Sequence, residues 1–93
     1  MLKLKGSVYE GEFLRNKKHG YGRLSYNNGD VYEGNFALDM KEGEGIFTWS
    51  DGSSYTGNFH IDMQHGPGKL VLIDGVTIEG DWTENNPLGR LNV

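Results

Sequence analysis

Residues 9–31 read YEGEFLRNKKHGYGRLSYNNGDV, and the stretch that follows them reads YEGNFALDMKEGEGIFTWSDGSS. The two stretches align without a gap, a third copy comes next, and the last residues match the beginning of a fourth. A fixed period of this kind indicates a repeat array, in which each unit contacts mainly its neighbours. We therefore expect a single domain over residues 1–93, made of a partial leading strand (1–8), three full repeats (9–31, 32–54 and 55–77) and an incomplete repeat (78–93).

Aromatic residues and glycines occupy fixed columns of this 23-residue repeat. Each unit begins with Tyr or Ile, a glycine follows two residues later, and Phe or Trp stands two residues beyond the glycine. Because so many columns recur together, the period is not a chance match. The main columns are Tyr9, Tyr32, Tyr55 and Ile78; Gly11, Gly34, Gly57 and Gly80; Phe13, Phe36, Phe59 and Trp82; Gly22, Gly45 and Gly68; and Tyr26, Trp49 and Leu72.

The spacing inside a unit predicts a β-hairpin. Tyr9, Gly11 and Phe13 point one way and the residues between them point the other, which is the alternation of a half-buried strand. The second half of the unit alternates likewise, so residues 13–20 are expected to join the two strands. A glycine repeated at one column of a strand suggests that a ring lies over bare backbone there.

Turn residues separate one strand from the next. Asn-Gly or Asp-Gly dipeptides between units tolerate positive φ angles and close tight antiparallel turns. Inside each hairpin, an Asn or Asp is expected to adopt left-handed backbone. The sequence therefore predicts an all-β fold, an elongated, single-layer, twisted antiparallel meander of hairpins. The turn residues are Asn28-Gly29, Asp51-Gly52 and Asp74-Gly75 between units, and Asn16, Asp39, Asp62 and Asn85 within them.

Composition limits the function classes. The chain has no cysteine, so disulfides and thiol chemistry are absent. The net charge of -4 is uneven, because residues 1–23 carry six bases against two acids and residues 24–93 carry three bases against eleven acids. Overall acidity disfavours nucleic acid as a partner. No stretch approaches the ~20 apolar residues of a membrane span, and Met1–Lys5 lacks the apolar core of a signal peptide, so we expect an intracellular, cytoplasmic protein, with the membrane periphery or the cytoskeleton left open.

Acids and histidines are too widely spaced for a catalytic or metal site. Glu10 and Glu33 fall one repeat apart, roughly 10 Å at the usual strand spacing. His19 and His65 fall two repeats apart, roughly 19 Å, whereas metal–ligand bonds are ~2 Å long. His60 is expected beside neither. We therefore predict no enzymatic activity, no metal and no cofactor.

The columns resemble the MORN repeat (membrane occupation and recognition nexus). The resemblance rests on residues 9–13 (YEGEF) with 19–24 (HGYGRL), on residues 32–36 (YEGNF) and on residues 55–59 (YTGNF). It implies a single-layer twisted sheet that acts as a groove-shaped adaptor for protein segments, with lipid or membrane association proposed for many members.

The predicted function is a non-catalytic binding or scaffold module whose groove receives an extended or helical segment of another protein. Large rings are enriched at interface hot spots, and those of the repeat columns are expected both to pack the sheet and to meet the partner. Tyr26 and Trp49, at strand ends, are expected to be half exposed. The predicted contact residues are Tyr9, Phe13, Tyr26, Tyr32, Phe36, Trp49, Tyr55, Phe59 and Trp82.

Three alternatives stay open on the sequence. A peripheral membrane module would use the basic first repeat, where each base near an anionic bilayer is worth about 1 kcal/mol. Arrays of glycines and rings also occur in carbohydrate-binding repeats. Uncapped partial repeats at Met1–Lys5 and Leu88–Val93, together with the charge gradient, favour self-association into homo-oligomers. The bases of the lipid hypothesis are Lys3, Lys5, Arg15, Lys17 and Lys18.

Overall fold

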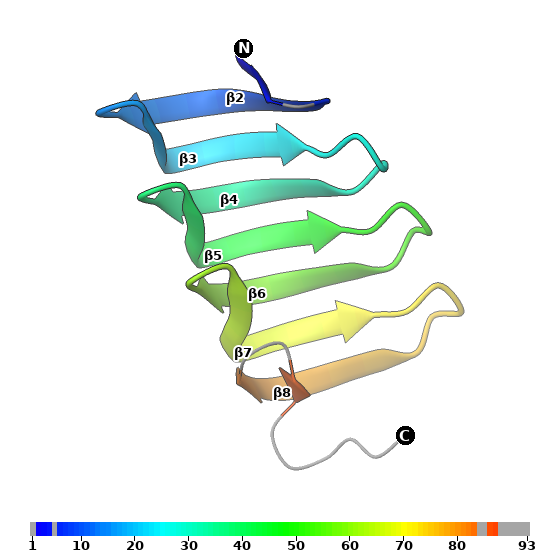
Figure 1. The fold of residues 1–93 in the computed structure, drawn as a ribbon. Helices are drawn as coiled ribbons and strands as arrows, with labels where there is room; N and C mark the ends of the chain where they lie inside the picture. The colour runs from blue at the N-terminus through cyan, green and yellow to red at the C-terminus, as the bar shows by residue number, and fades with distance from the viewer. Residues whose placement is uncertain (1, 5, 84–85, 88–93) are drawn as a thin grey trace.

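The computed structural model describes residues 2–4, 6–83 and 86–87, with side chains over 6–83. Within these residues, nine strands form one sheet in sequence order, each antiparallel to its neighbours, and Figure 1 shows consecutive strands side by side. The predicted single-layer antiparallel meander is confirmed, and the molecule extends 40 × 23 × 16 Å. The strands are β1 (Leu2–Leu4), β2 (Ser7–Leu14), β3 (Lys17–Ser25), β4 (Val31–Ala37), β5 (Met40–Thr48), β6 (Ser54–His60), β7 (Met63–Val71), β8 (Thr77–Thr83) and β9 (Asn86–Pro87).

Each complete hairpin is closed by two residues. β2 ends at Leu14, which pairs with Lys17 at the start of β3. The expectation that residues 13–20 form the connection was therefore wrong, because most of that segment is strand. Both turn residues have positive φ, as in the type I′ turns that match the twist of a hairpin. The left-handed backbone predicted at the second one is confirmed in these three hairpins, and Asn85 lies outside the described residues. The turn residues are Arg15 (φ 52°), Asn16 (φ 67°), Leu38 (φ 52°), Asp39 (φ 72°), Ile61 (φ 49°) and Asp62 (φ 67°).

Ile61 has left-handed backbone, which β-branched residues tolerate least. A β-branched residue in this region is strained by its own Cβ, whereas Asn visits the region readily. The side chain is also 48% exposed, so burial offsets little of the strain. We expect Ile61→Asn to raise the free energy of unfolding by about 1 kcal/mol, measured by urea denaturation.

The matched control for this prediction is Ile46→Asn. Ile46 is 45% exposed, close to the exposure of Ile61, but it lies inside strand β5. Asn is disfavoured in strands, so the same exchange should lower the stability there. A loss of stability in both variants would contradict the strain at Ile61.

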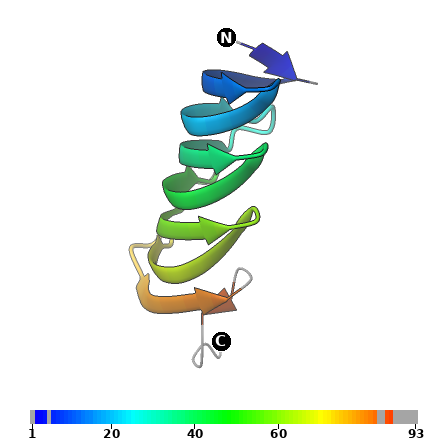
Figure 2. The same cartoon turned by 90° about the vertical axis from the view of Figure 1, so that its left-hand side faces the viewer.

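An irregularity in each hairpin bends the sheet. Between the pairs Gly11–Gly22 and Phe13–Lys18, one residue of β2 faces three residues of β3. The same shift recurs between β4 and β5 and between β6 and β7. The extra residues include a glycine with positive φ, Gly20 in the first hairpin (φ 81°). Bulges of this kind bend a strand, and Figure 2 shows each hairpin as a hooked ribbon.

Aromatic rings fill the inside of this bend. Consecutive rings are in edge-to-face contact, with centroids 4.9 to 5.3 Å apart and ring planes 77 to 90° apart. This geometry is favoured by the ring quadrupoles and adds to the burial of apolar area. The rings form one continuous ladder, named the ring ladder below, that runs through Phe13, Tyr9, Phe36, Tyr32, Phe59, Tyr55 and Trp82.

Each buried tyrosine lies over a bare glycine, as the repeated glycine column predicts. A Cβ added to Gly45 would come within 2.6 Å of Cε1 of Tyr32, which is closer than real contacts allow. Gly22 lies beneath Tyr9, and Gly68 lies beneath Tyr55, in the same way. The absence of a side chain at these glycines is therefore what admits the ring ladder.

Polar contacts tie the hairpin turns of successive repeats together. The backbone N–H of Lys18 donates to Oδ1 of Asp39 at 2.7 Å, and Nζ of Lys18 lies 3.3 Å from the same oxygen. Lys41 and Asp62 repeat these contacts at 2.8 and 3.4 Å. The backbone hydrogen bond from Lys18 is the main reason that the pKa of Asp39 lies below its ordinary value. The turns thus define the register of one repeat on the next.

Candidate docking surface

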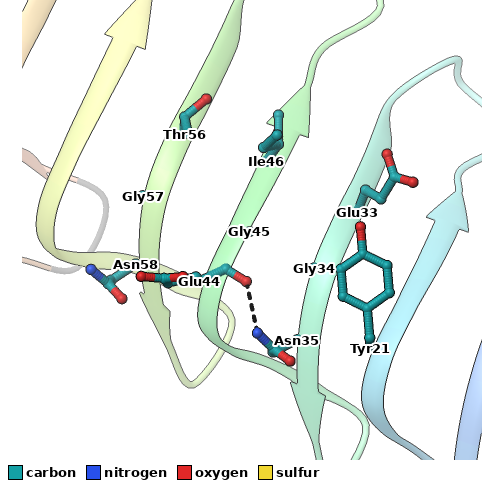
Figure 3. Close-up of a pocket in the computed structure, with 10 residues that line it drawn as sticks. All are labelled: Tyr21, Glu33, Gly34, Asn35, Glu44, Gly45, Ile46, Thr56, Gly57 and Asn58. Carbon is teal, nitrogen blue, oxygen red and sulfur yellow. Dashed lines mark hydrogen bonds between the residues drawn. The ribbon is translucent and has the colours of Figure 1, made fainter.

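The sheet has one covered face and one open face. The covered face carries the ring ladder, and Lys18 and Lys41 also fold over it, with Nζ 5.8 Å from the centroid of Tyr9 and 5.7 Å from that of Tyr32. Residues that alternate with the strand glycines point to the opposite face, because successive side chains of a strand alternate. Figure 3 shows part of that open face, where Glu33 and Asn35 flank Gly34.

The structure buries six of the nine rings that the sequence predicts as partner contacts. Tyr32 is typical: it is 0% exposed, and its hydroxyl donates to the carbonyl oxygen of Asn35 at 2.8 Å. Burial is also the main reason that the pKa of Tyr32 is raised. In this conformation these rings form the core and present no surface to a partner. The six buried rings are Tyr9, Tyr32, Phe36, Tyr55, Phe59 and Trp82.

The other three rings of the predicted set are accessible. Phe13 is exposed at the first end of the ring ladder. Tyr26 and Trp49 are half-buried, as expected, and pack against Phe47 with centroid distances of 5.7 and 4.9 Å. The hydroxyl of Tyr26 also accepts a hydrogen bond from Nζ of Lys41 at 3.5 Å. Partner contact through these three rings stays a prediction.

The open face carries a hollow that crosses the strands, named the glycine trench below. Its first part has a volume of about 420 Å³, and a second part continues it toward β8. Figure 3 shows the arrangement of the first part: glycine backbone forms the floor, and a row of side chains stands on each side of it. The floor is Gly34, Gly45, Gly57, Gly68 and Gly80; one wall is Glu33, Ile46, Thr56, Lys69 and Glu79; and the other wall is Tyr21, Asn35, Glu44, Asn58, Pro67 and Asp81.

Strand register explains why the two walls are continuous. Glu33 pairs with Ile46, and Ile46 pairs with Thr56, so these side chains stand in one row. Across the floor, Glu44 pairs with Asn58 in the second row. The trench is thus a direct product of the repeat, because the residues before and after each glycine column face the same way.

Two large apolar side chains line the trench and are open to solvent. Tyr21 is 57% exposed, and Ile46 is 45% exposed. They come from β3 and β5, and both line the first part of the hollow. Exposed rings and branched aliphatic groups beside a hollow are the usual anchors of a docking surface.

The histidines are not arranged as the spacing predicts. His60 and His65 have ring centroids 5.5 Å apart, so the expectation that His60 lies beside neither other histidine was wrong. The two-residue turn brings the end of β6 against the start of β7 and causes this contact. Nδ1 of His60 lies 2.7 Å from Oε2 of Glu42, and His60 is the main reason that the pKa of Glu42 is lowered.

Among the described residues, no group of three or more histidine, cysteine or acidic side chains is placed to hold a metal ion. Nor do these residues form a helix long and apolar enough to span a membrane.

The bases of the lipid hypothesis are only partly placed. Arg15 and Lys17 are exposed at the first hairpin turn, whereas the side chain of Lys18 is 13% exposed and pairs with Asp39. Lys5 lies outside the described residues, and so does the side chain of Lys3. The segment Leu88–Val93, invoked for self-association, also lies outside them, as does Met1.

The hairpins repeat with the same register and share the ring ladder as their core. This arrangement defines a β-hairpin repeat protein. The family model of the MORN repeat matches three consecutive segments of the chain, residues 9–31, 32–54 and 55–77. The chain therefore belongs to the MORN-repeat family, whose repeats are typically modules for interaction with proteins or membranes. No curated protein matches the chain.

Proposed function

We propose that this chain is a non-catalytic interaction module that holds a segment of another protein in the glycine trench. The observation that carries the proposal is the pairing of a hollow with two exposed apolar anchors, Tyr21 and Ile46. The opposite face is occupied by the chain's own rings, so the trench is the more accessible hollow.

The mode of binding follows from the ladder of hydrogen bonds. Each strand from β2 to β8 is paired on both sides, so the backbone groups of the trench floor are largely used within the sheet. A bound segment would therefore be recognised by side chains, not by addition of a further strand. Side chains at the floor positions would point to the ring face, so on the open face the floor presents backbone alone between the two walls.

The test begins with peptides selected by phage display against the whole chain. Their dissociation constants are then measured against the double variant Tyr21→Thr/Ile46→Thr, which keeps residues with high strand propensity. Loss of two apolar anchors is expected to weaken binding by about 10-fold or more. Circular dichroism would verify that the variant keeps its fold.

The control variant is Ile73→Ser/Val76→Ser. Ile73 and Val76 are exposed apolar residues in the turn between β7 and β8, outside the trench. Ser50 and Ser53 occupy the equivalent positions one repeat earlier, so serine suits this turn. Peptides that lose affinity for the control variant and keep it for the trench variant would contradict the proposal.

A further inference from the structure

Two sets of carboxylates among the described residues differ in their partners. Those near the turns hold the backbone: Asp30 accepts a hydrogen bond from Ser50 N at 2.8 Å, Asp74 accepts one from Val76 N at 3.0 Å, and Asp51 accepts one from Ser53 N at 2.9 Å. These acids have structural partners. Carboxylates of the second group, in the trench, have none of this kind.

Three trench carboxylates have no partner within the described part of the chain. Glu33, Glu44 and Asp81 are exposed, and their side chains form neither an ion pair nor a hydrogen bond there. Glu79 also lines the trench and has a loose contact of 4.0 Å with Lys69, which is the one base among the lining residues. Four acids against one base make the lining of the trench negative, and the nearest further base in the register is Arg23, which pairs with Glu33 outside the lining.

The acids stand at the two ends of the trench. Glu33 and Glu44 come from β4 and β5, and Glu79 and Asp81 come from β8. The trench residues between them come from β6 and β7: Thr56, Asn58 and Pro67 are uncharged, and Lys69 is a base, so this middle part carries no acid. At ~4.8 Å between strands, the two acidic pairs are roughly 15 to 19 Å apart, which about five or six residues of extended chain would span.

Because each acidic pair has one member on either wall, it can receive two successive side chains of an extended segment, which point in opposite directions. We infer that the glycine trench takes an extended protein segment with two basic residues at each end of a short uncharged stretch. This inference rests on the proposed function and adds the chemistry of the partner to it. Charge complementarity of this kind sets orientation and the rate of association.

The probe is a fluorescent peptide containing Lys-Arg-Thr-Val-Thr-Lys-Arg, with a second peptide that carries Glu in place of each base. Binding to the whole chain is measured by fluorescence anisotropy at low and at moderate salt. The basic peptide is expected to bind, and its affinity should fall as the salt concentration rises. The acidic peptide is expected not to bind. The double variant Glu33→Gln/Glu44→Gln should bind the basic peptide with an affinity about 10-fold lower.

The matched control is Asp51→Asn/Asp74→Asn, which changes the net charge by the same amount. Asn28 occupies the equivalent turn position and accepts the same local hydrogen bond, from Asp30 N at 3.0 Å, so the control should fold. Little change in this control, with loss in the trench variant, supports the inference. Equal loss in both variants, or no binding of the basic peptide, would overturn it.

The two proposals fail in different ways. Selected peptides that need Tyr21 and Ile46 but are indifferent to Glu33 and Glu44 would overturn the basic partner and leave the docking function standing. Peptides indifferent to all four positions would overturn both.

Discussion

Replacing Tyr32 by alanine is expected to lower the free energy of unfolding by about 3 to 5 kcal/mol, the usual cost of removing a buried ring. Tyr32 is fully buried and is in edge-to-face contact with Phe36 and Phe59, with centroids 5.0 Å away in both cases. Its loss would break the ring ladder in the middle of the sheet. Small domains have a free energy of unfolding of only about 5 to 15 kcal/mol, so the variant should lose a large part of its stability. Urea denaturation would measure this loss.

The control is the same exchange at Tyr21. This ring is 57% exposed on the open face, so Tyr21→Ala should change the stability by less than about 1 kcal/mol. Comparable losses at Tyr21 and Tyr32 would show that the rings are not divided between a core and a surface as described.

A methyl group added to the backbone beneath the Tyr32 ring is expected to have the second large effect on stability. We expect Gly45→Ala to lower the free energy of unfolding by about 1 to 3 kcal/mol, because the new Cβ would overlap the Tyr32 ring. Either the ring or strand β5 must shift to relieve the overlap. Urea denaturation would measure the loss.

A double-mutant cycle separates this overlap from a general effect of alanine in the strand. In a Tyr32→Leu background the ring is gone, and Gly45→Ala should cost clearly less than in the original chain. An unchanged cost would mean that the glycine is required for another reason.

Much of the fold could be predicted because the repeat is so regular. The period-two alternation around Gly11 and Gly34 places the strands, and the Asn-Gly and Asp-Gly dipeptides place the turns between hairpins. The contact of each tyrosine with a glycine also follows from the columns, since a strand position kept free of side chains needs a close neighbour.

The turn inside each hairpin could not be predicted in detail. Two-residue turns of this type usually contain Asn-Gly or Asp-Gly, whereas Arg15, Leu38 and Ile61 stand at their first position. Strand propensity and turn propensity conflict there, and the stacking of successive turns decides the outcome. The three-to-one bulge was missed for a different reason. Its signal in the sequence is the recurring glycine at Gly20, Gly43 and Gly66, and such a glycine can equally belong to a turn.

The docking surface proposed from the structure lies on the opposite face of the sheet from the rings that the sequence predicts as partner contacts. The alternation of side chains along each strand assigns the rings and the acids to opposite faces. It does not predict which of the two faces becomes buried when the sheet bends. The bulge at Gly20 and its equivalents bends the sheet toward the rings, so the rings become core. A signal for the trench was nevertheless present, in the polar residues that flank each glycine column.

The most direct test is to map the bound peptide by NMR on the isotopically labelled chain. Glycine amides are easily distinguished, and those of Gly34, Gly45 and Gly57 lie in the trench floor. Addition of a selected peptide is predicted to change the shifts of these amides most. The largest changes at Tyr26, Phe47 and Trp49 instead would place the partner on the ring side and contradict the assignment of the glycine trench as the docking surface.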